Sequence, residues 1–391
     1  MEETLKDIKC AIERSGFPLE HYIGLVLKQH GWQIITNRNY IDDIKGIERE
    51  IDILAYKIYP DKEENIDYVT TLIISCKKSD KYKWCFLTRD MDTNDCNMNF
   101  TPYHYCTSDE RLGYMTDNYL NRIIDQYKKH RTVKCLYTFN NKVVFAYQQL
   151  AEASTPNERI QKGNIFTVKN EEIYNSISTT IKAISNEKKG RLDAYDYSKK
   201  QRYYTFHAIS VFEGDMYEAH FDSDSAVDVK PISHIKYLNR HIVDGVDDFY
   251  IVHFINTEIF DYRLKIFDYM HDENVRTLPK LMTDFYKDIF SDYRRVNIFW
   301  KEFENLVVCR IKKILVEERV IGSSESVCLT YLYYQDQKIL EIGVNFSNYM
   351  PYEGAAQILN DNEELRKVTK HYLRSIYRYN GDFTFSEEFS F

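Results

Sequence analysis

The chain has 391 residues, of which 43% are hydrophobic and 29% are charged. This composition is typical of a globular protein with a sizeable core, and it excludes disordered and collagen-like chains. The net charge of −8 excludes a polycation, so contact with a nucleic acid requires a local cluster of Lys or Arg.

The N-terminal residues show no basic stretch followed by an apolar run, and no stretch of about 18 apolar residues occurs in the sequence. We therefore expect neither a secretory signal nor a membrane-spanning helix. Eight cysteines without such a signal favour a reducing compartment and free thiols. These observations predict a cytoplasmic protein.

Apolar periodicity in the first half of the chain predicts helices and strands in alternation. Helices are expected over residues 19–30, 114–130 and 171–187, and strands over 32–35, 50–58 and 68–76. Polar composition predicts loops over 37–46 and 87–112, and residues 132–150 are expected to form two short strands around Asn140-Asn141.

In the second half, strands are expected over 204–212, 216–221 and 249–255, and helices over 257–269, 278–290, 297–316 and 361–377. A hairpin is expected from 327–334 and 338–345. The order of elements predicts an α/β protein with a boundary near residue 272 and an α+β C-terminal region over 272–391.

Three charged residues stand out near the start of the chain. Glu20 lies in the first turn of a predicted helix, Asp52 lies within an apolar strand, and Lys77 ends another apolar strand. Charges rarely lie in buried strands unless they are paired or bind a ligand. A strand period of two puts Ser75 on the same face as Lys77. We expect Asp52, Ser75 and Lys77 to meet on adjacent strands, with Glu20 approaching from the helix.

Together these residues resemble the signature of a known superfamily. The stretches that carry the resemblance are Gly16-Phe17-Pro18-Leu19-Glu20, Gly31-Trp32, Glu50-Ile51-Asp52 and Ser75-Cys76-Lys77-Lys78. They resemble the restriction endonuclease-like superfamily with the PD-(D/E)xK signature, in particular its Mrr-like and related bacterial members, over about residues 15–90.

The resemblance implies a mixed sheet flanked by helices over residues 1–271 and a DNA-binding, Mg²⁺-dependent endonuclease that acts on foreign DNA in prokaryotic defence. It implies Asp52 and Glu20 as metal ligands, with Lys77 orienting the attacking water. Ser75 departs from the pattern, because the superfamily usually has a carboxylate there and Mg²⁺ prefers anionic oxygens. The alternative is therefore a catalytically degenerate nuclease fold that serves as a protein-interaction or scaffold module.

Simpler interpretations of the same residues stay open. Glu20 is also a residue type that favours the first turn of any helix, and Asp52 with Lys77 would make a plain ion pair. A third hypothesis is an α/β protein that is no nuclease and resembles the superfamily by accident. The sequence leaves open whether a protein partner or a homo-oligomer is involved.

A basic strip follows the third strand. Lys78, Lys81 and Lys83 alternate with Tyr82 and Trp84, a pattern suited to phosphate contact and base stacking, and equally to a solvated loop. Four further residues lie close in sequence and offer a weak zinc motif without a Cys-x₂-Cys unit: Cys85, Cys96, His104 and Cys106. Several histidines are scattered through the middle of the chain and are expected to be structural or exposed: His207, His220, His234, His241 and His253.

Overall fold

The computed structural model describes residues 2–41, 46–92, 94, 101–139, 141–193, 200–222, 226–347 and 352–387. The chain is mixed α/β and forms two compact units. Unit 1 joins Met1–Asp109 with Tyr119–Leu278, and unit 2 joins Glu110–Asn118 with Pro279–Phe391. Both the division after Leu278 and the boundary expected near residue 272 lie within one helix, α7 (Phe260–Tyr286).

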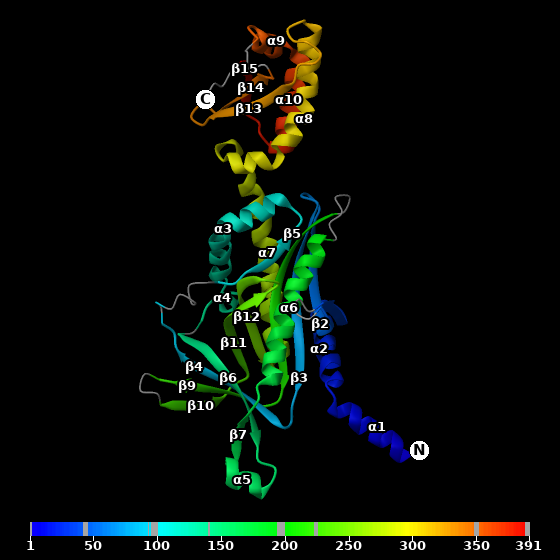
Figure 1. The fold of residues 1–391 in the computed structure, drawn as a ribbon, viewed down its shortest axis with the longest axis vertical. Coiled ribbons are helices and arrows are strands. Elements are labelled where there is room, and N and C mark those ends of the chain that lie inside the picture. Colours follow the sequence, from blue (N-terminus) through cyan, green and yellow to red (C-terminus); the bar gives the residue numbers. More distant parts are fainter. Residues whose placement is uncertain are drawn as a thin grey trace. The chain divides into compact units, whose positions relative to one another are not determined.

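A mixed sheet forms the centre of unit 1 (Figure 1). Its order is β1-β2-β3-β8-β12-β11, and a short strand, β5, pairs with β8. The strands are β1 (Gln33–Ile41), β2 (Glu48–Asp61), β3 (Ile66–Lys78), β5 (His104–Thr107), β8 (Gln201–Glu213), β11 (His234–Val243) and β12 (Val246–Asn256). β1, β2 and β3 are antiparallel neighbours, whereas β8 is parallel to both β3 and β12. Every residue of β3 up to Cys76 is buried, as in a strand covered on both faces.

Helices cover both faces of this sheet. α6 (Glu171–Asp193) places four isoleucines in the same core cluster as Val69 and Ile73 of β3: Ile173, Ile177, Ile181 and Ile184. The neighbouring residue Thr70 instead accepts a hydrogen bond from Asn274 of α7 at 2.8 Å, so α7 lies on the opposite face. α2 (Phe17–Gln29) begins with Pro18 in its first turn and buries Leu19, and α1 (Glu2–Arg14) precedes it.

A second sheet of unit 1 has the order β10-β9-β4-β6-β7. Its strands are β4 (Tyr82–Asp90), β6 (Lys142–Glu152), β7 (Ile165–Val168), β9 (Met216–Phe221) and β10 (Val227–Pro231). Trp84 of β4 is fully buried and stacks on Phe212 of β8, with ring centroids 3.9 Å apart. Aromatic packing therefore joins the two sheets into one core. Three further helices lie between β5 and β7 in the sequence: α3 (Glu110–Lys129), α4 (Lys134–Tyr137) and α5 (Pro156–Lys162).

Three predicted segments have the wrong structure, and the two helices expected over 257–269 and 278–290 are one helix, α7. The loop expected over 37–46 is strand as far as Ile41, because this segment pairs with β2 and buries Tyr40, while Asn37 with a φ of 55° is an irregular position within the strand. The loop expected over 87–112 contains the end of β4, all of β5 and the start of α3. Its polar residues misled the prediction, since buried Thr88 donates to Glu218 at 2.8 Å. The first strand expected within 132–150 is the helix α4.

In unit 2, helices pack against a sheet of order β13-β14-β15. The elements are α8 (Tyr293–Glu317), α9 (Ala355–Asp361), α10 (Glu363–Tyr377), β13 (Val327–Tyr334), β14 (Ile339–Phe346) and β15 (Asp382–Glu387). β13 and β14 form the predicted hairpin, which is confirmed. Tyr377 is fully buried and contacts the rings of Phe290 and Phe303 at centroid distances of 5.0 and 5.7 Å.

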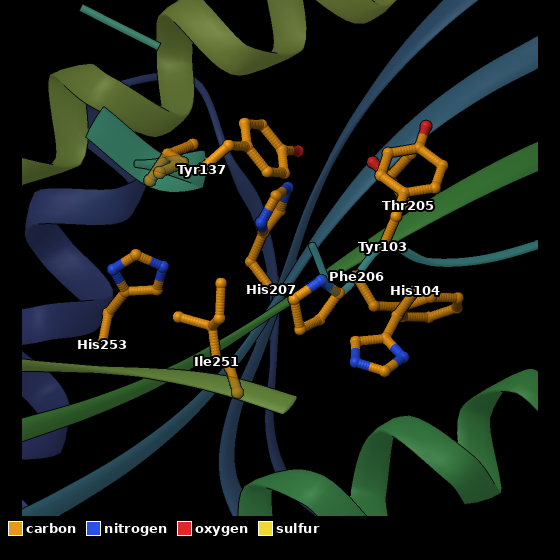
Figure 2. Close-up of a pocket in the computed structure, with 11 residues that line it drawn as sticks. Tyr103, His104, Tyr137, Thr205, Phe206, His207, Ile251 and His253 are labelled. Atoms are coloured by element: carbon orange, nitrogen blue, oxygen red, sulfur yellow. The ribbon is translucent and has the colours of Figure 1, made fainter. Parts of the chain in front are cut away.

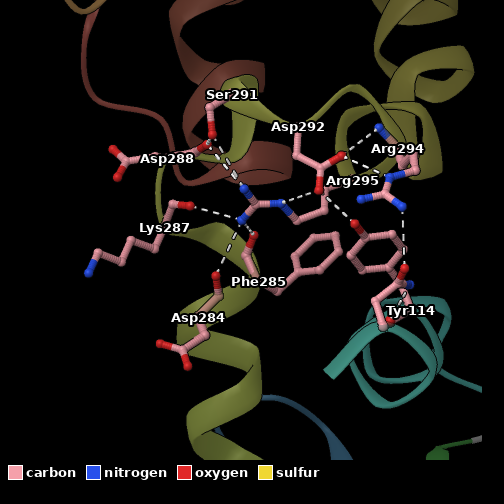
Figure 3. A network of polar contacts seen from close by, with 10 residues as sticks. Tyr114, Asp284, Phe285, Lys287, Asp288, Ser291, Asp292, Arg294 and Arg295 are labelled. Carbon is pink, nitrogen blue, oxygen red and sulfur yellow. Dashed lines mark hydrogen bonds and ion pairs between the residues drawn. The ribbon is translucent and has the colours of Figure 1, made fainter. Parts of the chain in front are cut away.

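Arg295 of unit 2 is a buried cation with many partners (Figure 3). Its guanidinium donates to the carbonyls of Phe285 and Lys287 at 2.8 Å and lies 3.6 Å from the Asp292 carboxylate. The last carbonyls of a helix lack intrahelical donors, so Arg295 satisfies the end of α7. Tyr114 donates to the same carboxylate at 2.6 Å, which extends the network to α3.

Candidate functional site

Asp52 and Lys77 lie on the adjacent strands β2 and β3, as expected. The Asp52 Oδ2 atom is 3.7 Å from Lys77 Nζ, and the two side chains are 18% and 31% exposed. The backbone N–H of Cys76 donates to the same Oδ2 atom at 2.6 Å. The Asp52 carboxylate is therefore held by one hydrogen bond and one ion pair and is still partly exposed, a position from which it can contact a ligand.

Glu20 of α2 lies within electrostatic reach of this pair. Burial and the Asp52 carboxylate raise the pKa of Glu20, Glu50 raises it further, and Lys77 opposes the shift. A carboxyl group whose pKa is raised by neighbouring carboxylates marks a place where negative charge is incompletely balanced. The structure thus brings Glu20, Asp52 and Lys77 together from three elements, α2, β2 and β3.

Glu172, in the first turn of α6, is a carboxylate that the sequence analysis missed. Burial raises its pKa, while a 3.4 Å hydrogen bond from Trp84 Nε1 and the charge of Lys77 act in the opposite direction. A Glu in the first turn of a helix is common, so nothing in the local sequence distinguishes this one. Glu172 joins the group of charged residues only in the folded chain, because α6 packs on β3, the strand of Lys77.

Ser75 does not join the group at the surface. Its side chain is fully buried, and its hydroxyl has no hydrogen-bond partner among the described residues. Its Cα pairs with that of Ser210, which receives a 2.6 Å hydrogen bond from Ser176 of α6. Because β3 is covered on both faces, Ser75 is inaccessible, although it lies on the strand next to that of Asp52. Ser75 is a core residue where the superfamily would place an accessible ligand.

The lysine strip is largely neutralised by acidic neighbours. Lys78 Nζ is 2.7 Å from Glu213, and Lys83 Nζ is 2.5 Å from Asp215. Lys81 lies 5.1 Å from the ring centroid of Tyr82. The suggested base stacking by Trp84 is wrong, because that ring is buried between the sheets.

The zinc motif receives no support from the described part of the chain. Cys85 and Cys106 are buried free thiols in different sheets, and Cys96 lies outside the described residues. Among the described residues, no group of three or more His, Cys, Asp or Glu side chains is arranged to hold a metal.

Three of the histidines surround a small cavity of about 30 Å³ (Figure 2). Burial lowers the pKa of His104 and of His207 to about 3 and lowers that of His253 well below its usual value, so all three are neutral near pH 7. The Nε2 atoms of His104 and His207 have no partner among the described residues. A cavity of this size holds water and is too small for a substrate.

A larger pocket of about 420 Å³ lies elsewhere in unit 1. Its charged lining residues are Lys142, Glu218, Lys230, Lys236 and Arg263. They come from β6, β9, β10, β11 and α7, so no sequence spacing could have revealed them.

No family model matches the chain, and no significantly similar curated protein or solved structure was found. No helix among the described residues is long and apolar enough to cross a membrane.

Proposed function

We propose that unit 1 is a nuclease-like domain that acts on DNA, with Glu20, Asp52 and Lys77 as its site. The observation that carries the proposal is the meeting of these three charged side chains from α2, β2 and β3. The mixed sheet with helices on both faces agrees with the restriction endonuclease-like fold that the sequence resembles.

The donor set suits a hard divalent cation. Mg²⁺ is commonly held by one or two carboxylates together with water and substrate phosphate, so Glu20 and Asp52 would suffice without Ser75. The raised pKa of Glu20, caused by burial and by Asp52, reflects negative charge that a cation would balance. When bound, Mg²⁺ would supply Lewis-acid stabilisation of the phosphate and a more acidic water.

The protein groups have separate roles in this proposal. The Cys76 N–H fixes the Asp52 carboxylate, so that its second oxygen keeps a defined direction. Lys77, 3.7 Å from Asp52, would orient the attacking water and stabilise negative charge that develops on the phosphate. Glu20 of α2 would supply the second anionic oxygen to the cation.

The second candidate is a binding module built on a degenerate nuclease fold. Burial of Ser75 favours it, because the usual third ligand is missing and its replacement is inaccessible. The ion pairs of Lys78 and Lys83 also favour it, because each lysine must leave a carboxylate before it neutralises a DNA phosphate.

Plasmid nicking with Mg²⁺ or Mn²⁺ tests the nuclease proposal. We expect cleavage by the wild type, loss of at least tenfold in Asp52→Asn and in Lys77→Met, and no change in Asp61→Asn. Asp61 is the matched control, since it lies at the far end of β2 and accepts the N–H of Glu63 at 2.9 Å. Equal cleavage by the wild type and Asp52→Asn would assign the activity to another site. No cleavage, together with no Mg²⁺-induced rise in melting temperature, would overturn the proposal.

A salt titration of duplex DNA binding tests the second candidate. Each neutralised phosphate contributes about −0.9 to the slope of log affinity against log salt, so three lysine contacts would give roughly −2.7. The ion pairs of Lys78 and Lys83 lead us to expect a shallower slope, and replacing Lys78, Lys81 and Lys83 by Ala should flatten it further. Absence of DNA binding by the wild type at low salt would support the interaction module instead.

A further inference from the structure

The 420 Å³ pocket of unit 1 is lined by more positive than negative side chains in the described part of the chain. Four cations line it against one carboxylate, Glu218. That carboxylate is already shared, because Lys230 Nζ lies 2.9 Å and Lys142 Nζ 3.7 Å from its two oxygens. Among the described residues, Lys236 and Arg263 have no acidic counterpart, in a chain whose net charge is −8.

Lys236 is held in place by neutral groups. Its ammonium donates to the carbonyl of Cys135 at 2.7 Å and to the carbonyl of Thr138, and it lies 4.3 Å from the ring centroid of Phe139. Among the described residues no carboxylate pairs with it. Burial, and then Arg263, lower the pKa of Lys236 to about 8, as expected for a cation with too little compensation.

Arg263 of α7 is in a similar position. One of its amino groups lies 3.0 and 2.9 Å from the two ring nitrogens of His234, and its Nε has no partner in the described part of the chain. Burial, Arg263 and Lys236 lower the pKa of His234 to about 3, so the imidazole is neutral and adds no charge. A guanidinium beside an ammonium is an arrangement that binds the oxygens of phosphate.

We propose that this pocket binds a small phosphorylated molecule, whose phosphate is held by Arg263 and Lys236. A volume of about 420 Å³ is in the range of small-molecule sites, and Phe139, Val144 and Ile235 give part of the wall an apolar surface. Phosphate fits better than a carboxylate, because its several oxygens can accept from both cations at once. The pocket shares no lining residue with the Glu20, Asp52 and Lys77 site, so the proposal does not rest on nuclease activity.

Isothermal titration calorimetry with pyrophosphate and with inorganic phosphate tests the proposal on the full chain. We expect saturable binding of pyrophosphate by the wild type with Kd below about 1 mM. Arg263→Gln should weaken binding at least tenfold, whereas Arg263→Lys, which keeps the charge but loses the planar fork, should have a smaller effect. Lys265→Met is the matched control, since Lys265 is exposed on the same helix, and it should bind like the wild type.

Arg263→Gln is the decisive variant, because Lys236→Met also removes the bonds to two carbonyls. An unchanged melting temperature shows that Arg263→Gln is folded; if it is not, Arg263→Lys carries the test. Absence of saturable binding by the wild type, or equal binding by the wild type and the folded Arg263 variant, would overturn the proposal. A loss of duplex DNA binding in Arg263→Gln as large as its loss of pyrophosphate binding would also overturn it, because the phosphate would then belong to DNA.

Discussion

Each unit of the molecule contains an arginine that is at least half-buried, and the two are compensated in opposite ways. Arg295 of unit 2 donates to helix-terminal carbonyls and lies 3.6 Å from Asp292. Arg263 of unit 1 contacts a neutral histidine, and among the described residues no carboxylate pairs with it. A buried cation compensated by a carboxylate and several carbonyls is part of the structure, whereas a cation without a carboxylate at the wall of a pocket is available for a ligand.

The largest effect is expected when the paired arginine, Arg295, is replaced. Arg295→Met leaves the end of α7 without its donors and Asp292 without a buried partner, so we expect unit 2 to lose about 3–5 kcal/mol of stability. Hydrogen exchange in α8 and α10, followed by mass spectrometry, measures the loss locally. Arg294→Met is the control, because Arg294 is exposed and contacts the same Asp292, and it should have little effect. Equal exchange in the wild type and Arg295→Met would mean that the network adds nothing to stability.

A charged substitution at Ser75 measures how much an unpaired buried charge destabilises unit 1. Ser75 is a fully buried residue of β3, a strand covered on both faces, so Ser75→Glu places a desolvated carboxylate on the strand next to that of Asp52. We expect a loss of about 3 kcal/mol in urea denaturation and no gain in Mg²⁺-dependent nicking. Ser75→Ala, which removes a hydroxyl that has no partner among the described residues, should be nearly neutral. A stable and more active Ser75→Glu would mean that the position opens to the metal site.

The contrast between Ser75 and Asp52 also shows how far sequence reasoning reaches. Local patterns predicted the strands β2 and β3, the helix α2 and the approach of Asp52 to Lys77, because apolar runs and strand pairing are short-range features. Burial of Ser75 depends on α6, about a hundred residues later in the chain, which local periodicity does not place against β3.

The proposed phosphate-binding pocket was even harder to predict from local sequence patterns. Lys142, Lys236 and Arg263 belong to β6, β11 and α7, and each looks like an ordinary surface cation in its own segment. The segments wrongly expected to be a loop over 87–112 and a strand before Asn140 contribute Thr88 and Cys135 to the same pocket. The excess of cationic over acidic side chains at this pocket becomes apparent only when the two sheets are assembled.

The smallest expected effect is a pH dependence of phosphate binding at the pocket of Arg263 and Lys236. The groups that face Lys236 are Arg263 from α7, His234 from β11 and the Cys135 thiol from α4, with Glu218, Lys142 and Lys230 around the pocket. His234, with a pKa of about 3, is neutral above pH 6, and burial raises the pKa of Cys135 above its usual value. Lys236, with a pKa of about 8, is therefore the group expected to change charge between pH 7 and 9.

Because Lys236 loses its proton as the pH rises through about 8, its attraction for phosphate should be present below that pH and weaken above it. We expect the affinity for AMP, whose phosphate has a second pKa of about 6 and is almost fully ionised over this range, to fall several-fold between pH 7 and 9. Calorimetric titrations at both pH values measure the change. In Lys236→Met the affinity should be lower and flat with pH, which separates the lysine from any titration elsewhere. A wild-type affinity that stays constant or rises with pH would remove Lys236 from the ligand contacts and leave Arg263 as the principal phosphate-binding group.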